Sequence, residues 1–227
     1  MKTLCIDTSS ASCSVALAID KDVFALFDDK PQAHSENVLS MCESVIAQAG
    51  ISRTELDLLA VTRGPGSFTG VRIGVSVAQG IAYALDIPVA PLSSLAVLAQ
   101  HTWLMHQSEN IFCLQDARMN EIYYGAYEIV NGIAQAVIEE GIDAPADICP
   151  SENRDWVSVG TAWAEYTQEL AKLHGKFSHI FTDVVVDARA MPALALDYHL
   201  KGHTVSATSL EPVYLRNKVA EKQHERG

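Results

Sequence analysis

The order of the predicted secondary-structure elements constrains this chain most, because both halves follow the same order. Alternating and continuous apolar runs in the first half predict three strands, then a helix, a strand, a helix, a strand and a helix. These elements are expected at residues 3–6, 14–19, 23–27, 35–49, 56–62, 69–85, 88–90 and 93–106. Such an order predicts the α/β class, with a mixed sheet and flanking helices.

The second half repeats this order more loosely and without visible sequence identity to the first. Its elements are expected at residues 111–115, 121–129, 133–141, 156–159, 162–173, 179–182 and 188–200, with a weak segment at 143–149 in the place of the first helix. Two such units predict two lobes with a cleft between them. We expect the N-terminal lobe at 1–107 and the C-terminal lobe at 108–204, with 205–227 as a candidate to pack back on the first lobe.

The composition excludes several classes of protein. Hydrophobic residues make up 48% of the 227, yet no stretch approaches the roughly 18–20 uninterrupted apolar residues of a membrane span. The five cysteines include no Cys-x-x-Cys pair, which favours free thiols in a cytoplasmic protein. A net charge of −12 argues against a broad nucleic-acid-binding surface. The locally basic residues 216–226 are interpreted as a solvated terminus rather than a phosphate-binding arm.

One carboxylate lies at the end of the first strand in each half. Asp7 ends the first strand and precedes Thr8 and Ser9, and Asp116 follows the strand at 111–115. Ligands bind beyond the carboxyl ends of strands in open α/β sheets, so two acids facing each other across a cleft would suit a Mg-nucleotide. A turn-capping role explains Asp7 equally well.

A glycine-rich segment, residues 63–72 (RGPGSFTGVR), joins a predicted strand to a predicted helix. It matches neither the Walker loop nor the Gly-x-Gly-x-x-Gly pattern. Free N–H groups at the helix start, flanked by two arginines, could hold an anion. A tight loop, in which glycines let helix and sheet approach closely, is the favoured interpretation.

The predicted helices at 35–49 and 69–85 have unusually wide apolar faces. At 100° per residue the apolar arcs span about 160° and about 200°, whereas a surface helix covering one core needs little more than about 100°. The excess predicts a second contact for both helices. A neighbouring helix of the same lobe and a partner chain both remain open, and the pattern alone favours the former.

Several catalytic patterns are absent from the sequence. No His-x-x-x-His, His-Glu-x-x-His or Gly-x-Ser-x-Gly occurs, so no helix presents a ready metal-binding pair and no nucleophile elbow is present. We therefore assign no catalytic residue and no metal ligand.

Four stretches together resemble the bacterial TsaB family, also called YeaZ. They are residues 4–17 (LCIDTSSASCSVAL), 64–74 (GPGSFTGVRIG), 116–118 (DAR) and 211–216 (EPVYLR). The resemblance follows the family in order and length over nearly the whole chain. It implies a two-lobed duplication of the actin/Hsp70/sugar-kinase type, which is ribonuclease H-like.

The resemblance also implies a function. Members of the family are non-catalytic partners of TsaD. With TsaE they are required to transfer a threonylcarbamoyl group from threonylcarbamoyl-AMP to N6 of adenosine 37, in tRNAs reading codons that begin with A. ATP and a metal ion would then belong to the partner subunits, with no cofactor on this chain. The chain would act as a dimerisation scaffold in the cytoplasm, away from membranes, and would form a homodimer when isolated.

The resemblance further implies which residues carry these roles. TsaD holds its metal through a His-x-x-x-His helix, and the matching residues 91–98 here (PLSSLAVL) contain no histidine. Asp7, Thr8, Ser9 and Asp116 are the candidates for a vestigial nucleotide site. The candidate partner interface comprises Val38, Leu39, Met41, Cys42, Val45, Val71, Gly74, Val75, Ala78 and Ala82. Aspartate at Val45 or Val75 is expected to abolish pairing with TsaD and to leave the fold intact.

Two other classes of function remain open from the residues. The first is an independent Mg-ATP-dependent phosphotransferase that uses Asp7 and Asp116. The second, weaker one is a peptidase. Tight binding of Mg-ATP to the isolated chain would favour the phosphotransferase over an accessory subunit.

Overall fold

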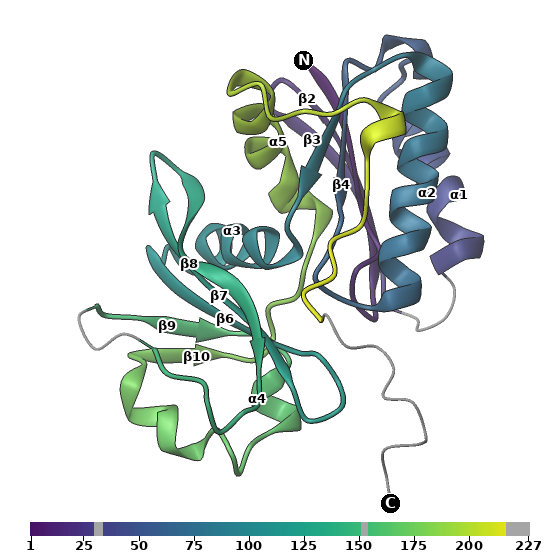
Figure 1. Cartoon of the computed structure of the whole chain (residues 1–227). Helices are drawn as coiled ribbons and strands as arrows, with labels where there is room; N and C mark the ends of the chain where they lie inside the picture. The colour runs from purple at the N-terminus through teal and green to yellow at the C-terminus, as the bar shows by residue number, and fades with distance from the viewer. Residues whose placement is uncertain (30–33, 151–153, 217–227) are drawn as a thin grey trace, which may run out of the picture.

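The computed structural model describes residues 1–29, 34–150 and 154–216, and the side chains of 34–36 lie outside this description. The basic residues predicted after Arg216 therefore also lie outside it. Two five-stranded sheets form the framework of two lobes (Figure 1).

The first sheet has the strand order β3-β2-β1-β4-β5. Its strands are β1 (Lys2–Asp7), β2 (Cys13–Ile19), β3 (Asp22–Asp28), β4 (Leu58–Thr62) and β5 (Val89–Leu92). The strands β1, β2 and β3 pair antiparallel, whereas β4 pairs parallel with β1 and β5 parallel with β4. β1 and β4 are almost completely buried, as expected for central strands covered on both faces.

The second sheet repeats this topology strand for strand. Its order is β10-β9-β6-β7-β8, with β6–β7 and β7–β8 antiparallel and β6–β9 and β9–β10 parallel. Its strands are β6 (Asn110–Asp116), β7 (Ile122–Val130), β8 (Ile133–Asp143), β9 (Val157–Val159) and β10 (His179–Phe181). The duplication predicted from the order of elements is therefore confirmed in strand order and direction.

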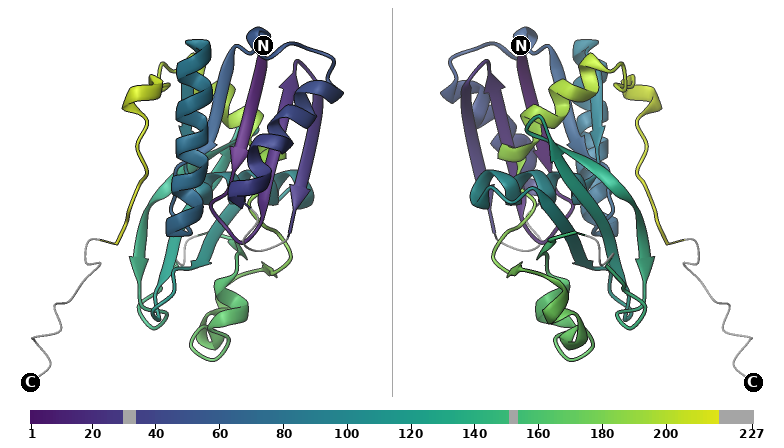
Figure 2. Two further views of the ribbon diagram at one scale, coloured as in Figure 1. Left: turned by 90° about the vertical axis from the view of Figure 1, so that its right-hand side faces the viewer. Right: turned by 90° about the vertical axis from the view of Figure 1, so that its left-hand side faces the viewer.

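Two helices cover the outer face of the first sheet. Helix α1 (His34–Gln48) packs on β2, and α2 (Phe68–Leu85) packs on β4 (Figure 2). The side chains beneath them form one apolar core with residues of the sheet such as Ile6, Leu17 and Val61. By length and composition alone, α2 is the one helix among the described residues that could cross a membrane. Its buried face against β4 is that of a core helix.

The predicted partner interface is largely buried within the chain itself, and its role in binding TsaD stays a prediction. Nine of its ten residues lie inside the core of the first lobe, namely Val38, Met41, Cys42, Val45, Val71, Gly74, Val75, Ala78 and Ala82. Leu39 is the exposed member, with 51% of its surface accessible. Most of each apolar arc therefore serves contacts within the lobe, and the helical period cannot distinguish these from contacts with a partner.

The other two long helices lie between the sheets (Figure 1). Helix α3 (Ser94–His106) follows β5 in the chain but packs on β6, β7 and β8, and α5 (Met191–Leu200) packs on β1, β4 and β5. A single core cluster includes both helices and strands of both sheets. A boundary at residue 107 assigns α3 to the N-terminal lobe and α5 to the C-terminal lobe. In the structure α3 packs on the second sheet and α5 on the first, so these two helices join the lobes.

The described part of the C-terminal segment, up to Arg216, runs beside the first lobe. The backbone of Val205 pairs with that of Val89 on β5, and the short helix η4 (Ala207–Ser209) packs on α2. Gln79 Nε2 on α2 donates to the carbonyl of Leu210 at 2.8 Å. These contacts cover the β5 edge of the first sheet and lead the chain towards the second lobe.

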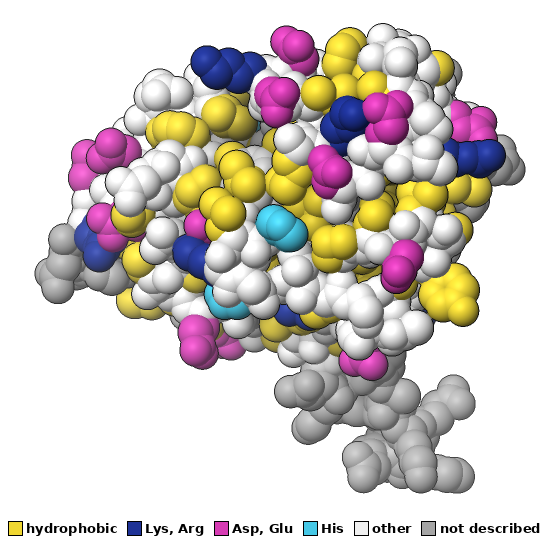
Figure 3. Space-filling model, turned by 90° about the horizontal axis from the view of Figure 1, so that it is seen from above, with side chains coloured by type: hydrophobic (Ala, Val, Ile, Leu, Met, Phe, Trp, Pro, Cys, Tyr) yellow, Lys and Arg dark blue, Asp and Glu magenta, His cyan; other side chains and the backbone are white. Residues whose placement is uncertain are grey.

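The second half departs most from its predicted helices. The weak segment predicted at 143–149 forms no helix: Asp143 ends β8, and a turn follows at residues 145–147. The helix predicted at 162–173 is reduced to α4 (Ala162–Glu165) and a separate 3₁₀ helix, η2 (Ala171–Lys176). Tyr166 is the C-terminal cap of α4, and its hydroxyl donates to Asp116 at 2.8 Å. Tertiary context commonly overrides helix propensity, which is only a weak guide. Acidic side chains are spread over the face seen from above in Figure 3, in keeping with the net charge of −12.

Candidate functional site

A cleft of about 1240 Å³ separates the two lobes on one side of the molecule. The first lobe contributes the turn after β1 and the start of α2, and the second lobe contributes the end of β6 and its neighbours. The lining residues are Ser9, Ser10, Ala11, Pro65, Gly66, Ser67, Phe68, Thr69, Gly70, Val71, Arg72, Ile73, Gln115, Asp116, Ala117, Arg118, Tyr123, Thr161, Val213, Tyr214 and Arg216. Small-molecule pockets usually enclose roughly 300–1,000 Å³, so this cleft is large for such a ligand.

The glycine-rich segment forms the first-lobe wall by packing directly on the turn after β1. A Cβ atom would lie 2.2 Å from the Ser9 carbonyl oxygen if added at Gly66, and 2.0 Å from the Thr8 carbonyl oxygen if added at Gly70. Ser67 caps α2 by accepting from the N–H of Gly70 at 3.2 Å, and its own N–H donates to Ser9 at 2.7 Å. The favoured interpretation of this motif, a close approach of helix and sheet, is confirmed.

Asp7 lies beneath this wall and does not line the cleft. It is fully buried, and its Oδ1 accepts from the backbone and hydroxyl of Ser9 and from the hydroxyl of Thr62. No described residue gives its Oδ2 a hydrogen-bond partner. Burial raises the pKa of the Asp7 carboxyl above its ordinary value, although these hydrogen bonds act in the opposite direction. Thr8 is also fully buried, and its hydroxyl donates to the carbonyl of Gly70 at 2.7 Å.

We predict that this burial makes the stability of the chain depend on pH through Asp7. Because its pKa is higher in the folded state, the folded state binds the proton more tightly, and stability falls as pH rises from the unfolded pKa towards the folded one. Asp7→Asn removes this loss. The melting temperature of Asp7→Asn minus that of the wild type is therefore expected to increase as the pH rises from 4 to 7, as measured by thermal denaturation.

Asp86→Asn, at an exposed helix end, controls for the replacement itself. A melting-temperature difference for Asp7→Asn that stays constant, or falls, over this pH range would contradict a buried Asp7 with a raised pKa.

Asp116 lines the opposite wall and is already engaged by its own lobe. Its Oδ1 accepts from the N–H of Arg118 and from the hydroxyl of Tyr166, each at 2.8 Å, and its Oδ2 pairs with the Arg118 guanidinium at 3.1 Å. Burial, together with the hydrogen bond to Asp116, raises the pKa of Tyr166 to about 12. Two acids facing each other across the cleft are therefore not formed. Of the four predicted nucleotide-site residues, Ser9 and Asp116 line the cleft, and Asp7 and Thr8 lie behind it.

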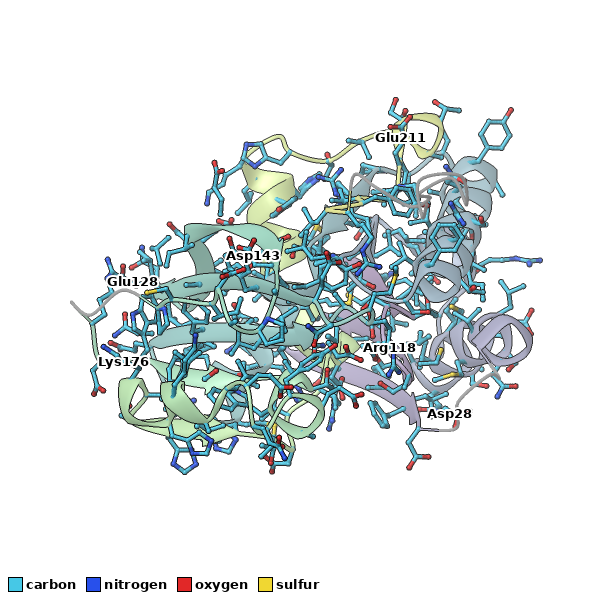
Figure 4. All side chains as sticks on the ribbon, turned by 60° about the horizontal axis from the view of Figure 1, so that its bottom comes forward. Asp28, Arg118, Glu128, Asp143, Lys176 and Glu211 are labelled. Carbon is cyan, nitrogen blue, oxygen red and sulfur yellow. The ribbon has the colours of Figure 1, made fainter. Side chains whose placement is uncertain are left out.

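The turn after β6 positions Arg118 over the cleft (Figure 4). Arg118, Met119 and Asn120 all have φ between 57° and 62°, a left-handed conformation that costs side-chain-bearing residues roughly 1–2 kcal/mol each. Arg216 holds this turn by donating to the carbonyl of Ala117 at 3.0 Å and to Glu121 at 2.7 Å. Strained backbone of this kind persists only where surrounding contacts hold it in place, and such residues cluster at functional sites.

The sequence placed Arg72 beside a candidate anion site, but the two aromatic rings that contact it at the mouth of the cleft escaped the sequence-based prediction. The guanidinium carbon of Arg72 lies 3.3 Å from the ring centre of Phe68 and 5.3 Å from that of Tyr214. The spacing of four between Phe68 and Arg72 on a predicted helix is the signal that could have found this pair. Tyr214 arrives from the C-terminal segment, and no local pattern indicates that.

Residues 91–98, which the resemblance aligns with the metal-binding helix of TsaD, take part in contacts between α3 and β8. Ser93 caps α3 by accepting from the N–H groups of Leu95 and Ala96, and its hydroxyl donates to Glu140 on β8. Tyr127 donates to the same carboxylate. Within the part of the chain that the structure describes, no group of three or more histidine, cysteine or acidic side chains could hold a metal ion.

Comparison with known proteins places this architecture in a family. Residues 29–224 match the family model described as TsaD, tRNA N6-adenosine threonylcarbamoyltransferase. The tRNA threonylcarbamoyladenosine biosynthesis protein TsaB of Haemophilus influenzae is 36% identical over 97% of this chain and 95% of its own length. The protein of the same name from Escherichia coli is 36% identical over 98% of both chains. The solved structure of YeaZ from Pseudomonas aeruginosa superimposes with a TM-score of 0.86 at 32% identity, covering 94% of this chain and 99% of its own.

Proposed function

The chain belongs to the TsaB family and takes part in the biosynthesis of threonylcarbamoyladenosine in tRNA, and we propose that it does so as a non-catalytic partner of TsaD. In this proposal TsaD, with TsaE, transfers the threonylcarbamoyl group from threonylcarbamoyl-AMP to N6 of adenosine 37. ATP and the metal ion are held by the partner subunits. The chain acts in the cytoplasm, where it makes TsaD competent.

The observation that carries this proposal is the full-length similarity to two TsaB proteins, at 36% identity over 97–98% of the chain. The geometry of the acids supports it. Asp7 is closed off from the cleft by Thr8 and Gly70, and Asp116 is occupied by Arg118 and Tyr166. Neither carboxylate is placed to take a phosphate-bound cation from the cleft. This is the arrangement expected of an accessory subunit rather than of a phosphotransferase.

We propose that TsaD binds the outer faces of α1 and α2, or that a second copy of the chain does so when TsaD is absent. Leu39 is exposed on α1, and Ile73, Val77 and Ile81 are half-buried along α2. The residues between them are mostly small: Ser40, Ser44, Ala47, Ser76, Gly80 and Ala84 are exposed. Small side chains let a partner helix approach closely over an apolar centre, as in stable helix-on-helix interfaces.

Reconstitution tests this function directly. We expect TsaD, TsaE, threonylcarbamoyl-AMP synthase, ATP, threonine and unmodified tRNA to yield threonylcarbamoyladenosine only when this chain is added, as measured by mass spectrometry of digested tRNA. Heat-denatured chain is the control.

Full modification without the chain would end the accessory-subunit proposal. Tight binding of Mg-ATP to the isolated chain in calorimetry, abolished by Asp7→Ala, would favour the phosphotransferase in its place.

A further inference from the structure

Positive charge is concentrated at the mouth of the cleft in an otherwise acidic chain. The protein has 16 lysines and arginines against 28 acidic residues, and Arg72, Arg118 and Arg216 all line the cleft. Asp116 and Glu121 each pair with one of these arginines. Among the ion pairs of the described residues none involves Arg72, whose guanidinium lies on aromatic rings instead. The cleft mouth therefore carries an unneutralised cation.

The aromatic side chains beside Arg72 are exposed to an unusual degree. Phe68 is 54% and Tyr214 46% accessible, and their ring centres are 5.9 Å apart with the planes tilted by 40°. Aromatic residues generally bury most of their surface, and neither ring is needed to close the apolar core beneath α2, because neither belongs to it. Arg72 covers one face of Phe68, and about half of the surface of each aromatic residue stays accessible beside this cation.

A planar cation next to open aromatic rings is the chemistry that recognises unpaired nucleotides. Bases that are not in a duplex stack on Phe, Tyr and Arg side chains, and arginines contact the phosphates between them. The volume of about 1240 Å³ fits several nucleotides of a strand better than one small ligand. Because the chain carries a net charge of −12, such a contact must be local and must depend on stacking as well as on charge.

We propose that the cleft mouth formed by Phe68, Arg72, Arg118 and Tyr214 binds an unpaired stretch of RNA. A base stacks on the Phe68–Tyr214 pair, and the adjoining phosphates contact Arg72 and Arg118. This inference rests on the proposed function, which supplies the RNA: the single-stranded loop of the tRNA that the complex modifies. The chain then contributes to substrate binding as well as to pairing with TsaD.

The experiment measures binding of a fluorescein-labelled tRNA anticodon stem-loop to the assembled complex of this chain with TsaD and TsaE, by fluorescence anisotropy. Removal of one stacking partner costs roughly 1–3 kcal/mol per base, so Phe68→Ala and Arg72→Ala are each expected to weaken binding at least about 5-fold. Arg72→Ala is expected to lower the slope of log affinity against log salt by about 1. Arg72→Lys keeps the charge and is expected to retain that slope while losing part of the affinity.

Two variants outside the cleft serve as matched controls. Phe27→Ala removes a phenylalanine of β3 that is 44% exposed, and Arg53→Ala removes an exposed arginine from the 3₁₀ helix η1 (Arg53–Glu55). Both are expected to bind the stem-loop like the wild type. Circular dichroism and co-elution with TsaD show that each variant is folded and assembled.

The outcomes separate this inference from the proposed function. Wild-type affinity in assembled Phe68→Ala and Arg72→Ala complexes overturns RNA binding at the cleft mouth and leaves the accessory role intact. Loss of Mg-ATP binding by these variants, with RNA binding unchanged, assigns the cleft to a mononucleotide and equally overturns the inference. Failure of the wild-type chain to support modification at all counts against the proposed function instead.

Discussion

Gly70→Ala is expected to destabilise the chain by about 3 kcal/mol or more and to lower its melting temperature by about 6–12 °C. The added Cβ would lie 2.0 Å from the carbonyl oxygen of Thr8. That oxygen belongs to the backbone of the turn after β1, which cannot move aside as a flexible side chain could. Helix α2 must therefore lift from the sheet, which opens the wall of the cleft and the apolar core beneath it.

Gly80→Ala is the matched control on the same helix. A Cβ at Gly80 meets nothing within 4 Å, and alanine is favoured over glycine in a helix interior by about 1 kcal/mol. This variant is expected to raise the melting temperature by about 2–4 °C. Thermal denaturation followed by circular dichroism measures both. Equal effects of the two replacements would mean that the glycines serve flexibility rather than close packing.

Val45→Asp is expected to unfold the first lobe, which reverses the outcome expected from the sequence. Val45 is fully buried between α1 and the sheet. Losing this apolar contact costs roughly 1.5–3 kcal/mol, and an unpaired carboxylate in the core adds several more. Together these approach the total stability of a typical domain, about 5–15 kcal/mol. We expect aggregated protein or a lost native circular dichroism spectrum.

Leu39→Asp, at an exposed position of the same helix, is expected to behave differently. Leu39 is 51% exposed, so its replacement should change stability by no more than about 0.5 kcal/mol. If the outer faces of α1 and α2 bind TsaD, an aspartate there should weaken pairing by about 30-fold, the effect of a loss of about 2 kcal/mol. Gel filtration and calorimetry with TsaD measure this.

Val137→Asp replaces an apolar residue of β8 in the second lobe that is 41% exposed, and it should leave pairing unchanged. Unimpaired pairing of Leu39→Asp would move the interface away from α1. A folded Val45→Asp variant would contradict the packing of α1 on the sheet.

Much of the architecture could be predicted from periodicity. Period-2 and period-3.6 patterns report which residues face an apolar layer, and they located all ten strands and the helices α1, α2, α3 and α5. The patterns failed where local preference was weak and tertiary contacts decided. Asp143 ends β8 and a turn follows at 145–147, where a weak helix was predicted, and the helix from Ala162 ends at Glu165, next to the hydrogen bond between Tyr166 and Asp116.

The candidate site was only partly predictable for a related reason. The glycine-rich segment was recognised because glycine spacing is a local property of the chain. The group of Phe68, Arg72 and Tyr214 was not recognised, because Tyr214 reaches α2 only after the chain has built the second lobe and returned. Asp7 and Asp116 occupy equivalent places in the two halves, yet one is sealed and the other lines the cleft.

By itself the sequence determined the class of fold, its duplication and its family, because strand and helix periods and a ten-residue glycine motif are written along the chain. Only the tertiary structure decided which apolar face is core and which is free, which lobe each central helix covers, and which polar groups reach the cleft. An apolar side chain has the same helical phase whether it packs on its own sheet or on a partner. A hydrogen bond or a stacked ring between distant segments depends on three-dimensional positions that no local pattern records.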